Sequence, residues 1–484
     1  MSRPDPFDPW RLALGPIREL SQWWRWWGST QDCMMAVHAD AAGLAKRRDA
    51  RLAGLVAHAA ANSPIYRELY RDIDPGRASL QSLPVVRRQT LMHRFDDWVT
   101  DRSIRLDEVR RFISDPARIG EPYRDRYVLW TSSGSTGEPG IFVQDEASLS
   151  VYEALLSTRF SAREHAESLW QTLAVGGRMA MLAAIDGHYA GVVTWERLRR
   201  RNPLLHACAR TFSVLQPIGE LVEALNAFEP RFIASYPTTM LLLADERRAN
   251  RLRVAPQTIW CGGETLADAE RARIESVFEC RVFQDYGASE AMAIAFDCGC
   301  GHLHLNCDWV ILEPVDAHYR PVPAGTASTT VLLTNLANRV QPIIRYDLGD
   351  SITMRASPCP CGSPLPALTV DGRRDDILCF VTPGGRSVRL LPLAVETAVE
   401  EGTGLARFQV IQIADDAVSV RFAPPAGTSR NAAWRRIRRA LGDYLVAQGL
   451  GDVAVNRDEQ VPRADPVSGK FRQVIRGPGV DSRP

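Results

Sequence analysis

The stretch Thr131–Pro139 combines residue types that bind phosphate. Within it, six consecutive residues supply four hydroxyl side chains and two glycines: Ser132, Ser133, Gly134, Ser135, Thr136 and Gly137. Glycines let the backbone approach an anion closely, and hydroxyl and N–H groups donate hydrogen bonds to phosphate oxygens. The stretch follows an apolar run that predicts a strand, and it matches neither the P-loop nor the dinucleotide fingerprint. The alternative, a flexible Ser/Gly linker, is disfavoured by that preceding strand.

Three later segments carry polar side chains just after predicted strands. They are Cys261–Thr265, Tyr286–Glu290 and Ile344–Asp350. In parallel α/β sheets, loops at the carboxyl ends of strands bind ligands. Tyr286 offers a flat face for a base, and Glu290 offers a carboxylate for a divalent cation. Each segment alone is weak evidence for a ligand site, so the argument depends on the order of the segments along the chain.

Lysine is scarce in this chain, which makes each lysine informative. Only Lys46 and Lys470 are lysines, and the other 56 basic residues are arginines. This bias fits a GC-rich genome. Arginine replaces lysine wherever only positive charge matters, but not where a compact ammonium group must fit. Lys46 lies beside two arginines and is interpreted as a surface residue, whereas Lys470 lies in a loop-forming Pro/Ser/Gly segment.

Two Cys-x-Cys pairs indicate a metal site. They are Cys298 with Cys300 and Cys359 with Cys361, separated by roughly 60 residues. Four thiolates that meet in space form the tetrahedral set that zinc prefers. We expect a structural Zn²⁺ on these four cysteines, with His302 or His304 able to replace one thiolate. The alternative is a set of reduced thiols in tight turns.

The elements around these motifs predict an α/β fold in two domains. Residues 1–125 show helical spacing of apolar residues, and residues 126–370 alternate short apolar runs with helical stretches, which indicates mostly parallel sheets flanked by helices. Beyond Asp371 the pattern is that of a small α+β unit. We therefore predict a large domain over 1–371 and a small, mobile domain over 372–484, joined at the charged segment Gly372–Asp376.

Composition and charge narrow the classes of function. The chain has 484 residues and a net charge of +1, which argues against broad nucleic-acid binding. No apolar stretch is long enough to span a membrane, and the N-terminus does not resemble a secretory signal, so we expect a cytoplasmic protein with reduced thiols. The tryptophans of Trp23–Trp27 form either a membrane-surface or partner-docking patch, or a helix whose indoles pack onto the body, and the second interpretation is preferred.

Taken in order, these motifs together with Gly372–Asp376 and Pro462–Lys470 resemble the adenylate-forming superfamily. That superfamily comprises acyl-CoA synthetases, peptide-synthetase adenylation domains and luciferases, and the chain looks most similar to the phenylacetate–CoA ligase branch. The resemblance runs from Arg51–Tyr66 to Lys470, nearly the full length. It implies ATP, Mg²⁺ and coenzyme A (CoA) as cofactors or cosubstrates.

The resemblance assigns the nucleotide site residue by residue. Ser132–Gly137 would be the phosphate loop, and the segment Gly262, Gly263 and Glu264 would line the adenine. Tyr286, followed by Gly287, would stack on the adenine ring. Asp350 would hold the ribose hydroxyls with help from Arg373.

The resemblance also assigns the reacting centre. Ser289, in place of the usual threonine, would contact the α-phosphate or the carboxylate, and Glu290 would bind Mg²⁺. Lys470 would bridge the carboxylate and the α-phosphate, and Asp375 would be the hinge of the small domain. One departure is Gly140, where many members have lysine.

The substrate pocket is the least defined part of the site. His188, Tyr189 and Tyr236 are its candidate walls, although a histidine in that position is as often a structural residue. The expected activity is ATP-dependent formation of acyl-AMP followed by thioester formation, with an aryl or arylacetic acid as the family-level substrate. Alternatives are transfer to a carrier-protein phosphopantetheine or an amine, and a degenerate nucleotide-binding scaffold. The oligomeric state, a homodimer included, is left open.

Overall fold

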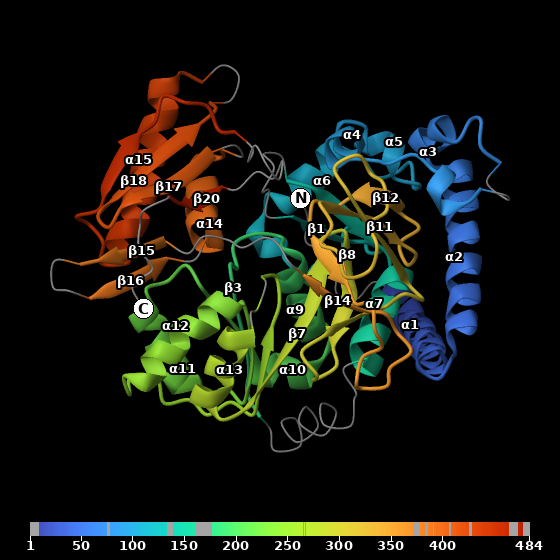
Figure 1. The fold of residues 1–484 in the computed structure, drawn as a ribbon, viewed down its shortest axis with the longest axis horizontal. Helices are drawn as coiled ribbons and strands as arrows, with labels where there is room; N and C mark the ends of the chain where they lie inside the picture. The colour runs from blue at the N-terminus through green and yellow to red at the C-terminus, as the bar shows by residue number, and fades with distance from the viewer. Residues whose placement is uncertain are drawn as a thin grey trace.

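The structure is a computed structural model of the whole chain (Figure 1). It describes residues 9–74, 78–132, 139–159, 177–264, 266, 268–370, 378–382, 386–390, 392–405, 408–424, 428–463 and 473–477. Four of the predicted features lie outside these ranges: most of the phosphate loop (Ser133, Gly134, Ser135, Thr136, Gly137), Arg373, Asp375 and Lys470.

The N-terminal part is helical, as predicted. Asp40 begins the second helix by accepting a hydrogen bond from the Gly43 N–H at 2.8 Å, and Ser63 ends that helix before Pro64 starts the next one. The helices are α1 (Pro9–Val37), α2 (Ala41–Asn62), α3 (Pro64–Leu69), η1 (Leu80–Ser82), α4 (Arg88–His93), α5 (Phe95–Trp98), α6 (Leu106–Ile113) and η2 (Pro116–Arg118).

A nine-stranded sheet forms the centre of the large domain, in the order β13-β14-β9-β8-β7-β6-β5-β3-β4. Its parallel half contains β3 (Met179–Ala183), β4 (Ala209–Ser213), β5 (Phe232–Ser235), β6 (Thr258–Cys261) and β7 (Arg281–Ala288). Its antiparallel half contains β8 (Ala291–Asp297), β9 (Leu303–Leu305), β13 (Ile352–Met354) and β14 (Ala367–Val370). The predicted α/β class is confirmed, although the sheet is mixed beyond β7.

Helices cover both faces of the parallel half (Figure 1). Adjacent residues of a strand point to opposite faces: Ile233 packs in the core with α11–α13, whereas Phe232 packs towards α9 and α10. This alternation explains why both faces are buried. The helices are α9 (Ala190–Arg201), α10 (Pro203–Cys208), α11 (Ile218–Phe228), α12 (Pro237–Arg248) and α13 (Asp268–Phe278).

Two smaller sheets complete the large domain. The hairpin of β1 (Val128–Thr131) and β2 (Ile141–Gln144) leads into α7 (Glu146–Arg159). An antiparallel sheet joins β10 (Val310–Val315), β11 (Thr330–Asn335) and β12 (Ile343–Asp347). Both pack with the N-terminal helices into one core, whose largest fully buried side chains include Trp98 and Trp130.

The C-terminal residues form a separate α+β unit with its own core, at the upper left of Figure 1. Its four-stranded sheet has the order β19-β18-β17-β20, and a two-stranded sheet pairs β15 with β16. The elements are β15 (Leu378–Val381), β16 (Ser387–Leu390), α14 (Pro392–Thr403), β17 (Phe408–Ala414), β18 (Ala417–Phe422), α15 (Arg430–Ala447), β19 (Ala454–Arg457) and β20 (Val474–Arg476). Ala394 and Tyr444 of this unit pack against the core around α11–α13.

The preferred interpretation of the tryptophan cluster is wrong for three of its indoles. Trp23, Trp24 and Trp27 are exposed, Trp24 at 63%, while α1 contacts α7. The exposed rings contact one another instead: Trp23 stacks on Trp27 at 5.8 Å and meets Trp24 edge-on at 5.0 Å. Helical spacing places these side chains together but does not say which side of the helix faces the body.

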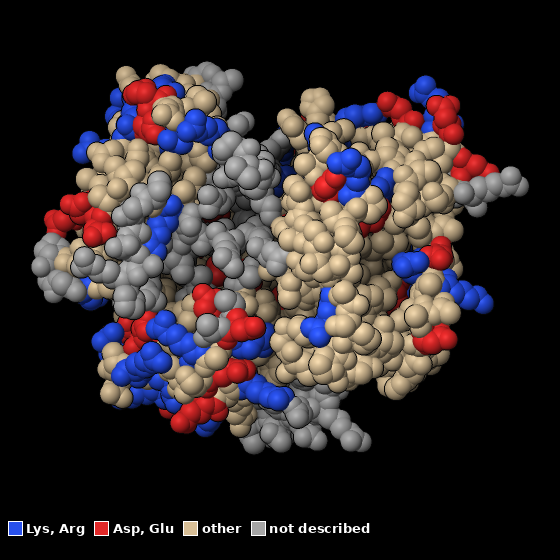
Figure 2. Space-filling model, viewed as in Figure 1, with Lys and Arg blue, Asp and Glu red and all other residues tan. Residues whose placement is uncertain are grey.

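Two surface features bear on the predicted classes of function. Among the described residues, no helix has both the length and the apolar character needed to cross a membrane. On the face in Figure 2, basic and acidic side chains are interspersed over α11–α13 and the small domain. This mixture is consistent with the net charge of +1.

Candidate functional site

The predicted phosphate loop is rooted in the hairpin of β1 and β2. Ser132 closes the base of the loop: its N–H donates to the Gly140 carbonyl at 2.9 Å, and its Oγ accepts from the Gly140 N–H at 2.8 Å. A side chain at position 140 would collide with the Phe142 ring, because its Cβ would lie 2.7 Å from Cε2. The glycine at this position is therefore a packing requirement.

The turn between β7 and β8 lies against this root. The Trp130 Nε1–H donates to the Ser289 carbonyl at 2.7 Å, and the Ser289 Oγ lies 3.4 Å from the Thr131 carbonyl. Gly287 allows a close approach within the turn, since a Cβ there would lie 2.2 Å from the Met292 carbonyl oxygen. The structure thus brings together two predicted motifs that lie about 150 residues apart.

Tyr286 and Asp350 meet at the same place. The Tyr286 hydroxyl donates to Asp350 Oδ2 at 2.8 Å, and both side chains are buried. Asp350 follows β12 after Gly349, whose φ of +79° turns the chain. The predicted base-stacking ring and the predicted ribose-binding carboxylate are therefore neighbours.

Glu290 is held by Tyr346, which lies within the predicted segment Ile344–Asp350, and by Asn335, which the sequence does not single out. Its carboxylate accepts a hydrogen bond from the Tyr346 hydroxyl at 2.7 Å, and the Asn335 side-chain N–H donates to its carbonyl at 2.8 Å. Glu290 is 6% exposed. A buried carboxylate fixed by β11 and β12 has the hard oxygen atoms that Mg²⁺ prefers, so the residues present fit the expected cation.

The end of β6 carries the predicted adenine segment. Gly262 donates its N–H to the Ser235 carbonyl at 3.1 Å, and Gly263 has a φ of +79°. A Cβ at Gly263 would lie 3.2 Å from the Tyr236 ring, so Tyr236 packs directly under this loop. Glu264 is close enough to Tyr236 to contribute, with burial, to raising the pKa of that phenol. Gly262, Gly263, Glu264 and Tyr236 thus form one group.

Asp285 also lies in this group, and sequence reasoning missed it. Its Oδ1 accepts a hydrogen bond from the Trp260 Nε1–H at 2.8 Å and would lie 2.5 Å from a Cβ at Gly262. Burial raises the pKa of this carboxyl to about 6. Its position next to Tyr286, at the carboxyl end of a predicted strand, was a usable signal, because ligands bind at such strand ends.

The remaining candidate pocket residues differ in role. His188 is buried, its Nε2 lies 3.1 Å from the Asp115 carbonyl and its ring meets Phe112 edge-on at 5.8 Å, so it is packed as a structural residue. Burial lowers the pKa of its imidazole. His188 and Tyr189 line a cavity of about 360 Å³ with Ser132 and with Glu400 of the small domain.

The small domain reaches this cavity through α14. Glu400 accepts a hydrogen bond from Gln473 Nε2 at 2.8 Å, and burial raises the pKa of its carboxyl to about 7. Tyr189 contacts the Thr397 side chain of the same helix. The small domain therefore lies directly against the root of the predicted phosphate loop.

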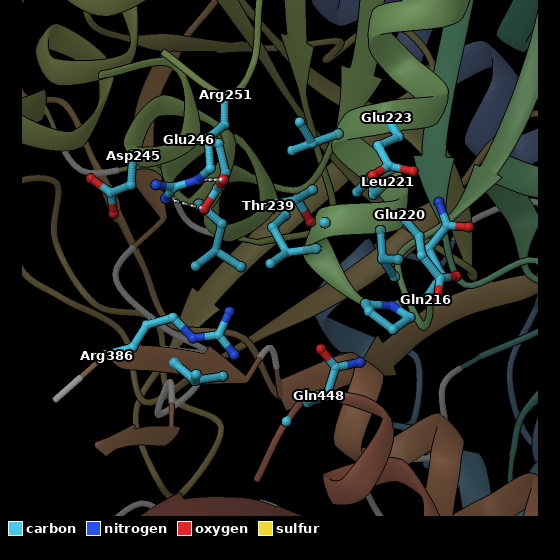
Figure 3. A pocket seen from close by; sticks show the side chains of 18 of the residues that line it. Gln216, Glu220, Leu221, Glu223, Thr239, Asp245, Glu246, Arg251, Arg386 and Gln448 are labelled. Carbon is cyan, nitrogen blue, oxygen red and sulfur yellow. Dashed lines mark hydrogen bonds and ion pairs between the residues drawn. The ribbon is translucent and has the colours of Figure 1, made fainter. Parts of the chain in front are cut away.

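A second, larger cleft separates the two domains. It has a volume of about 1490 Å³ and lies between α11 and α12 on one side and β16 and α15 on the other (Figure 3). Its charged groups have both signs: Arg251 pairs with Glu246, while Arg386, the residue before β16, extends into the cleft. Gln448 spans the gap, with its Nε2 3.3 Å from the Leu215 carbonyl.

The candidate metal centre contains three of the four predicted cysteines together with His304, one of the two histidines that the sequence named as replacements for a thiolate. The ligand atoms of Cys298, His304, Cys359 and Cys361 all lie within 4.8 Å of one another, whereas Cys300 is exposed and outside this group. The Sγ atoms of Cys298 and Cys359 are 3.7 Å apart, and Cys361 Sγ lies 3.3 Å from His304 Nε2. The physical reason is that His304 lies on β9 between β8 and β14, while Cys300 lies at the tip of the β8–β9 turn.

The histidine in this cluster is already oriented for a metal. His304 Nδ1 lies 2.8 Å from the Leu365 carbonyl, and that nitrogen must be the donor because a carbonyl can only accept. The neutral ring then presents the lone pair of Nε2 to the three thiols. An outer hydrogen bond of this kind is the usual companion of a zinc-bound histidine.

A second group of potential ligands is already neutralised by arginines. It consists of Asp32, Cys33 and Asp308. Arg47 and Arg51 pair with Asp32, and Arg159 pairs with Asp308 at 3.0 Å. These ion pairs join α1, α2 and α7 to the body, which is a structural role.

Comparison with known proteins identifies the fold. No protein-family model matches the chain. A structure of 2-hydroxyisobutyryl-CoA ligase in complex with 2-HIB-AMP and CoA in the thioesterification state superposes with a TM-score of 0.53 at 21% identity, covering 89% of this chain and 90% of that one. The same ligase in the postadenylation state with R3-HIB-AMP gives 0.50 at 20% identity, covering 89% and 88%. The chain has the fold of this CoA ligase.

One curated relative also matches in sequence. Protein CapK of Staphylococcus aureus is 24% identical over 260 residues, which covers 52% of this chain and 53% of CapK. The match thus spans about half the length of that relative.

Proposed function

We propose that this chain is an adenylate-forming ligase that activates a carboxylic acid with ATP and transfers the acyl group to a thiol. One observation carries the proposal: the Tyr286 hydroxyl donates to Asp350 beside the root of the Ser132 loop. Tyr286 would be the stacking ring, Asp350 would bind the ribose, and the described root of the predicted phosphate loop lies beside them, so together they would form a nucleotide site. The fold shared with a CoA ligase supports the same activity.

The first half-reaction makes acyl-AMP. A carboxylate oxygen attacks the α-phosphorus of ATP, the bond from that phosphorus to the bridging oxygen breaks, and pyrophosphate leaves with the electron pair. No proton is transferred in this step, so catalysis is positioning and charge neutralisation. Ser289 would contact the reacting oxygens and Lys470 would neutralise them. Mg²⁺, held by Glu290, would supply further charge neutralisation.

The second half-reaction makes the thioester. A thiol loses its proton, its sulfur attacks the acyl carbon, and AMP leaves with the electron pair. We favour CoA as the thiol, because the fold is shared with a ligase whose structure contains CoA. A carrier-protein phosphopantetheine uses the same chemistry, and an amine is the other acceptor. The aryl or arylacetic class of acid and the phenylacetate–CoA ligase branch stay predictions.

The proposal includes a rotation of the small domain at the predicted domain boundary. One small domain would serve both half-reactions by turning about Asp375, so that different faces meet the nucleotide site. The contact of α14 with Tyr189 is one such arrangement.

A screen for pyrophosphate release tests the proposed function. The full-length protein is incubated with ATP, Mg²⁺ and a panel of carboxylic acids, with and without CoA. We expect pyrophosphate release with at least one acid and a thioester when CoA is present. Release without a thioester would favour a carrier protein or an amine as acceptor, and an absence of ATP turnover with every acid would favour the nucleotide-binding scaffold.

We also propose that Cys298, His304, Cys359 and Cys361 bind a structural Zn²⁺. Three thiolates and one imidazole give the tetrahedral donor set of closed zinc sites. The site joins the β8–β9 turn to the turn before β14, so the metal would hold together the antiparallel end of the large sheet.

Protein prepared without chelator should contain about one equivalent of zinc. Cys359→Ser should lower both the zinc content and the melting temperature, because the metal contributes its binding free energy only to the folded state. Cys208→Ser, at a cysteine outside the cluster, is the matched control and should change neither. His304→Ala distinguishes a site that contains His304 from one that contains Cys300. Full zinc content in this variant would identify Cys300 as the fourth ligand. Wild-type protein without zinc would refute the metal site.

A further inference from the structure

The predicted phosphate loop brings no positive charge of its own. No lysine or arginine occurs in the sequence between Arg126 and Arg159, and the residue directly after the loop is the acidic Glu138. Both flanking arginines are engaged elsewhere: Arg126 pairs with Asp101 at 3.5 Å, and Arg159 pairs with Asp308. Bound ATP carries several negative charges, which neutral N–H and hydroxyl groups balance only in part.

A cation from another part of the chain reaches the base of this loop. The Arg88 Nη1–H donates to Ser132 Oγ at 3.3 Å, across 44 residues of sequence. Its Nη2 is buried and has no hydrogen-bond partner among the described residues. A buried guanidinium N–H without an acceptor is costly, so its position is explained best if a ligand supplies the acceptor.

The backbone around Arg88 is fixed on both sides. The Val86 N–H donates to the Arg345 carbonyl at 3.1 Å and the Val86 carbonyl accepts from Asp347 at 2.9 Å, which ties this segment to β12. On the other side of Arg88, the Met92 sulfur accepts a hydrogen bond from the Ile141 N–H at 3.4 Å. Arg88 is thus held between the strand that leads to Asp350 and the hairpin that carries the loop.

We propose that Arg88 binds the β- and γ-phosphates of ATP and the departing pyrophosphate. The assignment rests on the proposed function, which places the ribose at Asp350 and the phosphates at the loop. During adenylation the pyrophosphate oxygen takes the electron pair of the broken bond, and Arg88 remains protonated while it neutralises the added charge. A lysine in place of Gly140 could not supply that cation, because a side chain at this position would collide with the Phe142 ring.

Nucleotide binding by the full-length protein tests this role without knowledge of the acid. Titration calorimetry with MgATP, inorganic pyrophosphate and AMP compares the wild type with Arg88→Gln. We expect the variant to bind ATP and pyrophosphate about 10- to 100-fold more weakly, the effect of one charge-assisted contact, and to bind AMP normally. Arg88→Lys, which keeps the charge, should lie in between.

Arg87 provides the matched control. It is adjacent, but its side chain donates to the Tyr319 hydroxyl at 2.8 Å on the exposed side of the segment. Arg87→Gln should therefore bind all three ligands as the wild type does. Equal ATP binding by Arg88→Gln and the wild type, or an equal loss of ATP and AMP binding, would overturn the assignment. If Arg88→Gln does not fold, Arg88→Lys decides: weaker pyrophosphate binding with normal AMP binding supports the role, whereas pyrophosphate binding equal to that of the wild type, or a loss shared with AMP, refutes it.

A different result would refute the proposed function. A wild type that binds ATP but releases no pyrophosphate with any acid would refute the ligase activity, while the comparison of Arg88→Gln with Arg87→Gln would still report on the phosphate subsite.

Discussion

Replacing Lys470 by alanine is expected to slow adenylation by roughly 10²–10³-fold, the usual loss for one preorganised electrostatic donor. In a chain with two lysines among 58 basic residues, a lysine that matches the family position indicates a chemical demand. A compact ammonium group can contact a carboxylate oxygen and an α-phosphate oxygen together, whereas a guanidinium prefers to grip one anion with two N–H groups. Lys470→Arg should therefore be nearly as slow as the alanine variant.

The measurement is ATP–pyrophosphate exchange with an acid found by the screen. Lys46→Ala is the matched control, because Lys46 is exposed on α2 and is the other lysine of the chain. Transfer from pre-formed acyl-AMP to the thiol should survive in Lys470→Ala much better than adenylation, since that step breaks no bond to pyrophosphate. Exchange at the wild-type rate in Lys470→Ala would refute the role.

The sequence predicted the parallel half of the fold well because its strands are continuous apolar runs with polar residues at their carboxyl ends. The predicted strands around Ile233, Ile259 and Phe283 are β5, β6 and β7. The antiparallel strands β8, β9, β13 and β14 were harder, since pairing across a sheet edge depends on contacts distant in sequence. The mixed character of the large sheet therefore appears only in three dimensions.

The choice of ligands in the metal cluster could not be predicted from the sequence either. The Cys-x-Cys spacing favoured four cysteines, but spacing does not determine which side chain points inward. His304 is completely buried on β9 while Cys300 is exposed on a turn, so register and turn geometry choose the ligand. For the same reason, Tyr346 and Arg88 could not be assigned from sequence: each reaches the site from an element that is distant along the chain.

Glu290→Gln is expected to lower ATP–pyrophosphate exchange by about 10²-fold or more at limiting Mg²⁺. The substitution keeps the size of the side chain and an oxygen that can accept the Tyr346 hydrogen bond, now 2.7 Å long, but it removes the negative charge that a hard cation requires. Because Glu290 is buried, loss of its charge should not lower the melting temperature. Raising the Mg²⁺ concentration should recover part of the lost rate.

Tyr346→Phe is the matched control for this prediction. It removes the hydroxyl that contacts Glu290 Oε1 but keeps the carboxylate. Its exchange rate should therefore fall by about 10-fold, the lower end of the cost of one hydrogen bond to a charged group. The two variants separate charge from orientation when each is titrated with Mg²⁺. Two results would contradict the prediction: Glu290→Gln requires no more Mg²⁺ than the wild type, or Tyr346→Phe loses as much activity as Glu290→Gln. In either case the carboxylate would act through its hydrogen bond to β12, and other groups would have to bind the cation.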